Sequence, residues 1–270
     1  MGVHEERLTK SCRKNQMIQK TIFGKPIEGA YKRYLSEQEK KPDKEKEIII
    51  PPTEIQNPEK YLILKGRTHS KYSYPDIGVA VERTHHDKDW YQAHEALHHE
   101  GSFMLTIRQF VDFLSLLKSG KAYYASGDKA DTQTLNSILD EILAVREPCR
   151  GEWLDADFKT ISGALHINYS HKFINSQLQP TYSEPLEECL METKLPGIGL
   201  NYWLRNATSQ GLPPVKTPNG DLRYWAPASN NNSVAVFDSD AGGAWFDCLG
   251  GPSSSISSFG VRQAKILQRK

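Results

Sequence analysis

The sequence predicts an α+β domain, on two observations. The middle of the chain carries apolar residues at helical spacing, bounded by capping residues. The C-terminal part instead carries short apolar pieces separated by Gly, Pro, Ser, Asn and Asp, which is typical of brief strands joined by turns and loops. With 270 residues, 38% of them hydrophobic, the chain is long enough to bury a large core.

Three helices are predicted most clearly. The first runs from about residue 90 to residue 100 and is followed by Gly101, a residue that favours helix ends. The second begins after Thr106, a good N-cap, and Gln109 completes a capping box; Gly120 ends this helix. The third runs from about residue 131 to residue 146, with apolar residues along one side.

Shorter elements are expected farther along the chain. We predict two short helices, around residues 185–192 and 200–208. Beyond residue 211, three pieces are typical of strands: Leu222–Trp225, Ser233–Phe237 and Gly260–Ile266. The residues between them are expected to form long, irregular but ordered loops, because several aromatic side chains there need a core.

The first sixty residues differ in composition from the rest. Residues 1–60 are rich in Lys, Glu and Gln, so we expect a charged N-terminal arm or linker followed by one domain over residues 61–270. The first residues are charged where a secretory signal would be apolar, and no apolar run approaches membrane-spanning length. We therefore expect synthesis in the cytoplasm without a signal peptide, and no membrane insertion. A net charge of +1 gives no support to a nucleic-acid partner.

Residues 94–98 read HEALH, which matches the HExxH pattern of zinc peptidases. Such a site needs a third protein ligand, and the metzincin continuation of the pattern has Met104 where its third His belongs. We therefore interpret His94 and His98 as part of an amphipathic helix and expect no metal site or cofactor there; whether a structural metal is bound stays open. A zinc metallopeptidase stays the alternative. The buried side of that helix is predicted to hold Trp90, Ala93 and Leu97.

Three segments together resemble two related families. Gly242–Trp245, read with Phe259–Arg262, resembles the GGSW…GFR pattern of the formylglycine-generating-enzyme superfamily and of the variable proteins of diversity-generating retroelements. Met104–Leu114 resembles the early helix of those proteins, and Arg150–Ala156 resembles a strand that viral and prokaryotic variable proteins carry. The resemblance spans roughly residues 61–270.

The resemblance implies a C-type lectin-like fold, with small twisted antiparallel sheets, packing helices and long ordered C-terminal loops. The sequence departs from the family pattern at Ala244, where Ser is usual, and at Val261, where Phe is usual. A formylglycine-generating oxidase needs a pair of reactive cysteines, and Cys248 has no other thiol near it in the sequence. The variable proteins therefore fit better than the oxidase, which remains an alternative.

Variable proteins are ligand-binding proteins of viruses, phages and prokaryotes, and the resemblance implies the same non-enzymatic role here. In that family an error-prone reverse transcriptase randomises template adenines. The variable region would cover about residues 200–266, which are rich in the residue types that altered Asn codons encode. The implied partner is a protein or glycan on a target cell surface, and the chain could belong to a virion. Oligomeric state stays open, since such proteins include trimers and monomers.

The predicted ligand-binding residues lie in this variable region. They are Asp238, Asp240, Phe246, Asp247, Leu249, Gly250, Ser253, Ser254, Ser255 and Ser257. An apolar frame beneath them is expected to consist of Trp225, Val234, Phe237, Trp245, Phe259 and Val261. The alternative is a set of inert loops whose Ser, Asn and Gly residues serve only turn formation.

Overall fold

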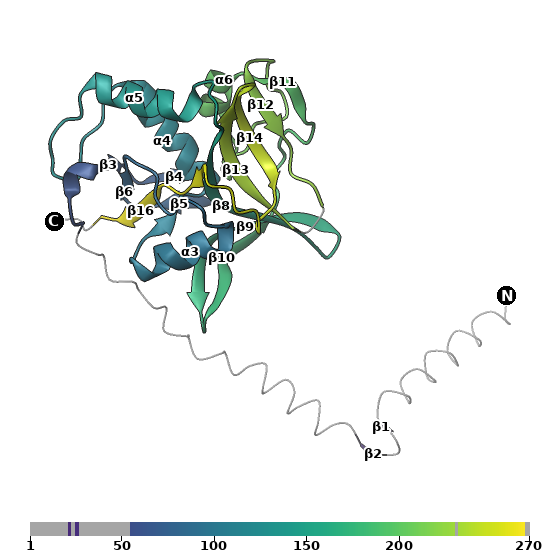
Figure 1. Ribbon diagram of the computed structural model, residues 1–270. Helices are drawn as coiled ribbons and strands as arrows, with labels where there is room; N and C mark the ends of the chain where they lie inside the picture. Colours follow the sequence, from purple (N-terminus) through teal and green to yellow (C-terminus); the bar gives the residue numbers. More distant parts are fainter. Residues whose placement is uncertain (1–20, 23–24, 27–54, 230–231, 268–270) are drawn as a thin grey trace. The chain divides into compact units, whose positions relative to one another are not determined.

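The computed structural model describes residues 21–22, 25–26, 55–229 and 232–267 (Figure 1). The chain divides into two compact units, residues 1–49 and 50–270. In the first unit the described residues form one short antiparallel pair, β1 (Thr21–Ile22) and β2 (Lys25–Pro26). The other residues of the predicted N-terminal arm before residue 55 lie outside the described residues. All other elements belong to the second unit.

Four α-helices are present in the described part of the second unit, and they confirm most of the predicted ones. Thr106 caps its helix through a complete capping box with Gln109, and Gly120 ends that helix at a φ of 64°. The third predicted helix ends at Leu143, a little earlier than expected. The helices are α3 (Trp90–His99), α4 (Ile107–Ser119), α5 (Thr132–Leu143) and α6 (Leu200–Asn206).

The short helix predicted around residues 185–192 is wrong. A strand ends at Pro185, and the residues after it have no helical hydrogen bonds. The backbone there is held by side chains instead, because the Glu187 N–H donates to the Gln210 side chain at 2.9 Å and the Glu187 carboxylate accepts from the Ser209 N–H at 2.9 Å. Long-range contacts of this kind leave no signal in the local sequence.

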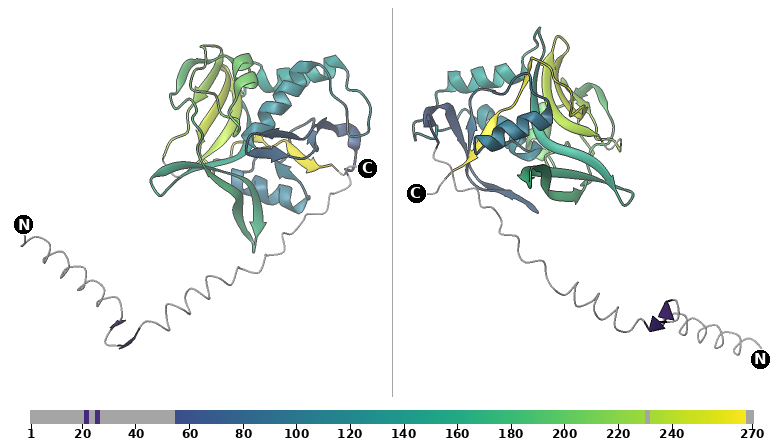
Figure 2. Two further views of the ribbon diagram at one scale, coloured as in Figure 1. Left: turned by 180° about the vertical axis from the view of Figure 1, so that it is seen from behind. Right: turned by 60° about the horizontal axis from the view of Figure 1, so that its bottom comes forward.

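The largest sheet has eight strands and both kinds of pairing. Most neighbours are antiparallel, but β12 and β14 are parallel to each other, as are β15 and β8. In spatial order the sheet holds β10 (Gln177–Pro185), β9 (Ala164–Ile174), β8 (Arg150–Ile161), β13 (Ser233–Asp240), β14 (Gly243–Gly250), β12 (Leu222–Trp225) and β11 (Lys194–Ile198), with β15 (Phe259–Gly260) beside β8. The β9–β10 hairpin projects from the domain (Figure 2).

Smaller sheets complete the domain. A four-stranded antiparallel sheet brings segments from both ends of the domain together, in the order β3 (Tyr61–Leu64), β6 (Ile77–Ala80), β16 (Gln263–Ile266) and β7 (Phe103–Met104). Strands β4 (Arg67–His69) and β5 (Tyr72–Tyr74) form a separate hairpin, and η1 (Pro58–Lys60) is a short 3-10 helix. The mixture of helices and sheets confirms the α+β class.

Two cores lie on opposite faces of the large sheet. The main core lies between this sheet and α4, α5 and α6, and Phe110 of α4 meets Phe237 of β13 in it at 5.1 Å between ring centroids. A smaller core lies between the other face and α3, where Trp90 and Leu97 pack near Trp153 and Val236. Only part of this second face is covered, and the uncovered part positions the candidate site.

Candidate ligand-binding face

Strand β14 separates core residues from surface residues by simple alternation. Ala244, Phe246 and Cys248 are buried in the main core, while Trp245, Asp247 and Leu249 are half-buried on the other side. The alternation follows from the pleat of a β-strand, in which successive side chains point to opposite faces. The strand predicted at Ser233–Phe237 is confirmed as part of β13. The loop expected after it is wrong as far as residue 250, because β13 continues to Asp240 and pairs with β14 in a hairpin.

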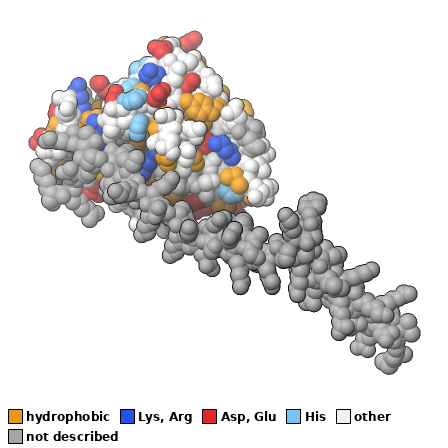
Figure 3. Space-filling view, turned by 90° about the horizontal axis from the view of Figure 1, so that it is seen from below, with side chains coloured by type: hydrophobic (Ala, Val, Ile, Leu, Met, Phe, Trp, Pro, Cys, Tyr) orange, Lys and Arg blue, Asp and Glu red, His pale blue; other side chains and the backbone are white. Residues whose placement is uncertain are grey.

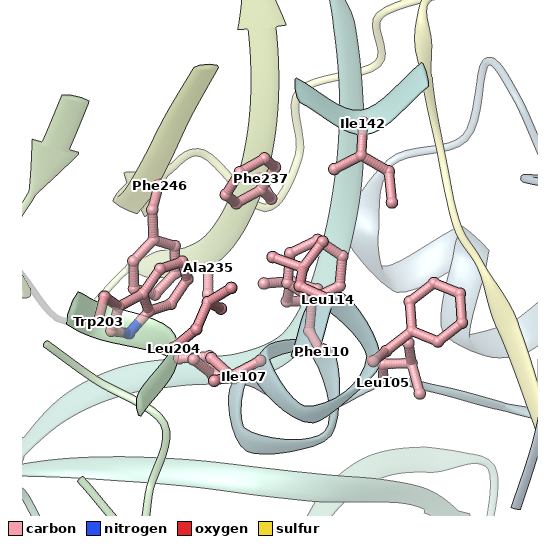
Figure 4. Close-up of a cluster of buried hydrophobic side chains, with 14 of the residues drawn as sticks. Leu105, Ile107, Phe110, Leu114, Ile142, Trp203, Leu204, Ala235, Phe237 and Phe246 are labelled. Carbon is pink, nitrogen blue, oxygen red and sulfur yellow. The ribbon is translucent and has the colours of Figure 1, made fainter. Parts of the chain in front are cut away.

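Phe246 was predicted to contact ligand, and this prediction is wrong. Its side chain is fully buried and stacks on Trp203 of α6, with 4.8 Å between the ring centroids. Figure 4 shows the two rings next to each other. The cause is the register of the hairpin, which pairs Phe246 with the equally buried Phe237. A shift by one residue would reverse every side chain of the strand, so this pairing decides which of the two adjacent aromatic residues lies inside.

The frame residues divide in the same way. Val234, Phe237, Phe259 and Val261 are buried as predicted. Trp225 and Trp245 are half-buried on the uncovered side of the sheet instead, stacked on each other at 6.0 Å. Their assignment to the interior frame is therefore wrong.

Three strands contribute to this uncovered surface, which we call the open face. Cross-strand pairs place Arg223 beside Trp245, Trp225 beside Asp247 and Asp238 beside Trp245. The open face consists of the half-buried side chains Arg223, Trp225, Asp238, Asp240, Trp245, Asp247 and Leu249. Three of the seven are carboxylates and two are indole rings, so the surface combines acidity with flat apolar area.

The polar contacts of the open face fix the Trp245 ring. Its indole N–H donates to Asp240 Oδ1 at 3.1 Å, and the Arg223 guanidinium lies 4.8 Å from the ring centroid. Asp240 also accepts from the Gly242 N–H at 2.6 Å, which closes the hairpin turn. A ring held in place from both sides offers a rigid contact surface at low cost in conformational entropy.

Two groups of the open face have a buried polar atom without a hydrogen-bond partner, the Trp225 indole N–H and Asp238 Oδ1. Burial raises the pKa of Asp238 to about 7, with further contributions from the carboxylates of Asp247 and Asp240 and an opposing one from Arg150. Burial also raises the pKa of Asp247, whose Oδ1 accepts from the Leu249 N–H at 2.7 Å. A ligand that donates a hydrogen bond or brings a cation would stabilise this pair.

The serine loop comprises residues 253–257 after β14, and its side chains lie at the surface. The four serines that were predicted as ligand contacts, Ser253, Ser254, Ser255 and Ser257, are all exposed. The Ser255 hydroxyl donates to the Asp87 carbonyl at 2.8 Å, and the Pro252 carbonyl accepts from the Trp90 N–H at 3.0 Å. The loop is therefore attached to the N-terminal end of α3.

Gly250 is not suited to the variable role that was predicted for it. A Cβ at this position would lie 2.7 Å from a methyl group of Val236 and 3.0 Å from the Val234 carbonyl oxygen. Both partners belong to the neighbouring strand, so any larger residue would push β13 and β14 apart. The ten predicted residues therefore divide into eight at or near the surface and two, Phe246 and Gly250, that the fold constrains.

A separate hollow of about 780 Å³ lies between α5 and the segment after β6. Its charged lining includes Arg83 and Glu141, but both are already engaged in an ion pair of 3.2 Å with each other. Arg83 also donates to the Gly151 carbonyl at 2.7 Å and to the Ser258 carbonyl at 2.9 Å. These charges hold chain segments together, so we give the open face precedence as the candidate binding site.

The HExxH pattern does not form a site of its own. His94 is buried, whereas His98 is exposed and its ring contacts Phe173 at 5.3 Å. Histidine side chains are visible on the side of the molecule seen from below, where α3 lies (Figure 3). The predicted buried residues Trp90, Ala93 and Leu97 are confirmed.

His94 instead belongs to a cluster that the sequence did not reveal. His94, Asp155 and His171 come from α3, β8 and β9, and their ligand atoms lie within 4.8 Å of one another. All three are buried, and they are the group in the described residues that could hold a metal ion. No local spacing connects residues so far apart in the sequence, so only the fold could bring them together.

The cysteines give little support to oxidase chemistry. Cys189 and Cys248 are buried and unpaired by disulfide. Burial raises the pKa of the Cys189 thiol to about 12 and holds that of Cys248 well above its ordinary value. Both thiols are therefore protonated near neutral pH in the folded chain.

Comparison with family models, with curated proteins and with solved structures gives no match for this chain. No helix in the described residues is long and apolar enough to cross a membrane.

Proposed function

We propose that this chain is a non-enzymatic recognition protein that binds its ligand on the open face and the adjoining serine loop. The observation that carries the proposal is the separation of core and surface side chains on β13 and β14. One side of these strands builds the main core, and the other side carries Trp245 and three carboxylates next to Trp225 of β12. Val234 and Val236 on that second side belong to the smaller core with α3, but the open-face side chains can change without removing a contact of the main core.

The proposal includes a C-type lectin-like scaffold diversified by a retroelement. Its support is the sequence resemblance together with the place of the GGxW segment, Gly242–Trp245, at the tip of the β13–β14 hairpin. Gly243 has a φ of 114°, and a Cβ on Gly242 would lie 2.2 Å from the Arg223 guanidinium. Gly243 thus has a conformational reason to stay glycine while its neighbours vary, whereas a side chain at Gly242 would displace only the flexible end of Arg223.

The chemistry of the open face favours a protein or glycan ligand with hydrogen-bond donors or positive charge. Aromatic side chains supply large rigid contact areas, and carboxylates accept hydrogen bonds from hydroxyl, amide or cationic groups. The serines of residues 253–257 add adaptable polar contacts of the kind found in antibody loops.

The zinc-peptidase alternative has less support from the geometry. His94 points into a buried cluster while His98 is at the surface, so the two imidazoles do not converge on one accessible ion. A catalytic zinc also needs an open coordination position.

Population sequencing of the gene tests the proposed function. Natural variants should concentrate at residues 238, 240, 247 and 249 and in the serine loop, should follow template adenines, and should leave residues 244, 246 and 248 unchanged. Variation no denser there than upstream, or spread equally over both sides of β14, would reject retroelement diversification.

A further inference from the structure

The buried cluster behind α3 has an imbalance of donors and acceptors. His94 Nε2 lies 3.6 Å from Asp155 Oδ1, too far for a hydrogen bond, and has no other partner in the structure. His94 is only 4% exposed, so water does not replace the missing partner freely. A buried imidazole nitrogen left without a partner destabilises the fold by about 1–3 kcal/mol.

The direction of His94 Nε2 sharpens this imbalance, because the nearest polar atom is a carboxylate oxygen that it does not reach by a hydrogen bond. In the tautomer with its lone pair on Nε2, His94 would present that lone pair to the Asp155 oxygen, which is a repulsive arrangement. A cation placed between the two atoms would convert both into ligands.

His171 supplies the third ligand atom and is already oriented. Its Nδ1 lies 2.5 Å from Asp155 Oδ1, and its Nε2 lies 3.3 Å from Asp157 Oδ1 on the same strand as Asp155, at ion-pair distance but outside hydrogen-bond geometry. Asp157 also forms an ion pair with Lys159, with 2.6 Å between Asp157 Oδ2 and Lys159 Nζ. A carboxylate that holds the far nitrogen of a metal-binding histidine fixes the ring orientation and strengthens the ligand.

We propose that His94 Nε2, His171 Nδ1 and the Asp155 carboxylate bind one divalent cation of the zinc class, with Asp157 as the carboxylate that orients His171. Imidazole and carboxylate ligands together suit zinc better than calcium or magnesium, which take oxygen ligands. On binding, His171 releases its Nδ1 proton to solvent and keeps the proton on Nε2, the nitrogen that faces Asp157. This inference does not depend on the proposed function.

The surroundings of the cluster indicate a structural site. Trp90 places its ring edge-on against both imidazoles, at 4.3 Å from His94 and 4.9 Å from His171. Its own N–H groups are held by the Leu154 carbonyl and by the Pro252 carbonyl of the serine loop. The ion would thus fasten α3 to β8 and β9 at the point where the serine loop is attached.

Metal analysis of the full chain tests the proposal, with His98→Ala as a matched control one helical turn from His94. The purified protein is stripped with a chelator, titrated with zinc chloride, and analysed for bound zinc after dialysis. We expect about one zinc per chain in the wild type and in His98→Ala. His94→Ala and His171→Ala should lose the zinc, and Asp157→Asn should bind it about 10–100-fold more weakly.

Three results would overturn the proposal. They are wild-type protein without stoichiometric zinc, His94→Ala that retains it, and His98→Ala that loses it; the last would instead favour the HExxH pattern. If His94→Ala fails to fold, the cobalt-substituted wild type decides through its visible spectrum. Nitrogen and oxygen ligands give d–d bands without thiolate charge transfer, whereas thiolate bands or no bound cobalt would contradict the site.

Discussion

Truncation of Phe246 is predicted to cost far more stability than truncation of Leu249 on the same strand. The Phe246 side chain is 0% exposed, stacks on Trp203 at 4.8 Å and lies 5.7 Å from the Tyr224 ring. Removing a buried Phe side chain to Cβ typically costs about 3–5 kcal/mol through lost burial and the cavity left behind. Leu249 is half-buried on the open face, so Leu249→Ala should cost about 1 kcal/mol.

Equilibrium unfolding in urea, followed by tryptophan fluorescence and circular dichroism, measures both variants. With a slope of about 2–3 kcal/mol per molar urea, Phe246→Ala should lower the unfolding midpoint by roughly 1–2 M. The Leu249→Ala midpoint should stay within about 0.5 M of the wild type. If Phe246→Ala costs no more than Leu249→Ala, the register of the hairpin is wrong and the open face is misassigned.

Three further predictions concern single groups. Glu152→Gln should lower the free energy of unfolding by about 3–5 kcal/mol in urea, because it leaves the buried Arg150 and Arg262 guanidinium groups short of a counter-charge; a loss below about 1 kcal/mol would contradict this. Thr106→Ala should cost about 1–2 kcal/mol in the same assay, since it removes the N-cap of α4 and the partner of the Tyr72 hydroxyl, and an unchanged midpoint would refute the cap. Asp238 has a pKa of about 7 in the folded chain, above that of an unfolded Asp. Unfolding therefore releases a proton between these two pKa values, so the wild type should lose stability relative to Asp238→Asn as the pH rises from about 4 to about 7. If the melting temperatures of the two proteins change with pH in the same way over that range, the assignment is contradicted.

The helices were predictable because their signals are local. The capping box of α4 lies within four consecutive residues, Thr106–Gln109, and the Gly120 end needs only a left-handed backbone. In contrast, the long strand β9 carries His, Asn, Ser and Lys among its apolar residues and β10 carries Gln, Ser and Glu, which hides the alternation of a strand. The pairing of β9 with β8 and of β10 with β9 overrides this weak local signal.

The candidate sites were harder to predict because they depend on tertiary pairing. Trp245 and Phe246 are adjacent aromatic residues, so the sequence alone does not say which of them lies inside. The contact with Trp203 and the pairing with Phe237 decide it, and both partners come from other elements. The same holds for the His94 cluster, whose two other members come from β8 and β9.

A pair of display libraries most directly tests the central claim, that the open face recognises ligands while the opposite side of the same strands holds the fold. One library randomises residues 238, 240, 245, 247, 249 and 253–257, and the other randomises residues 235, 237, 244, 246 and 248. The measurement is the fraction of clones that display folded, protease-resistant protein and are enriched on an immobilised cell-surface protein or glycan. We expect the first library to display folded protein and yield binders, and the second to lose folded protein. Equal loss of folded protein in both libraries, or binders from the first library whose affinity survives reversion of the randomised positions, would contradict the account.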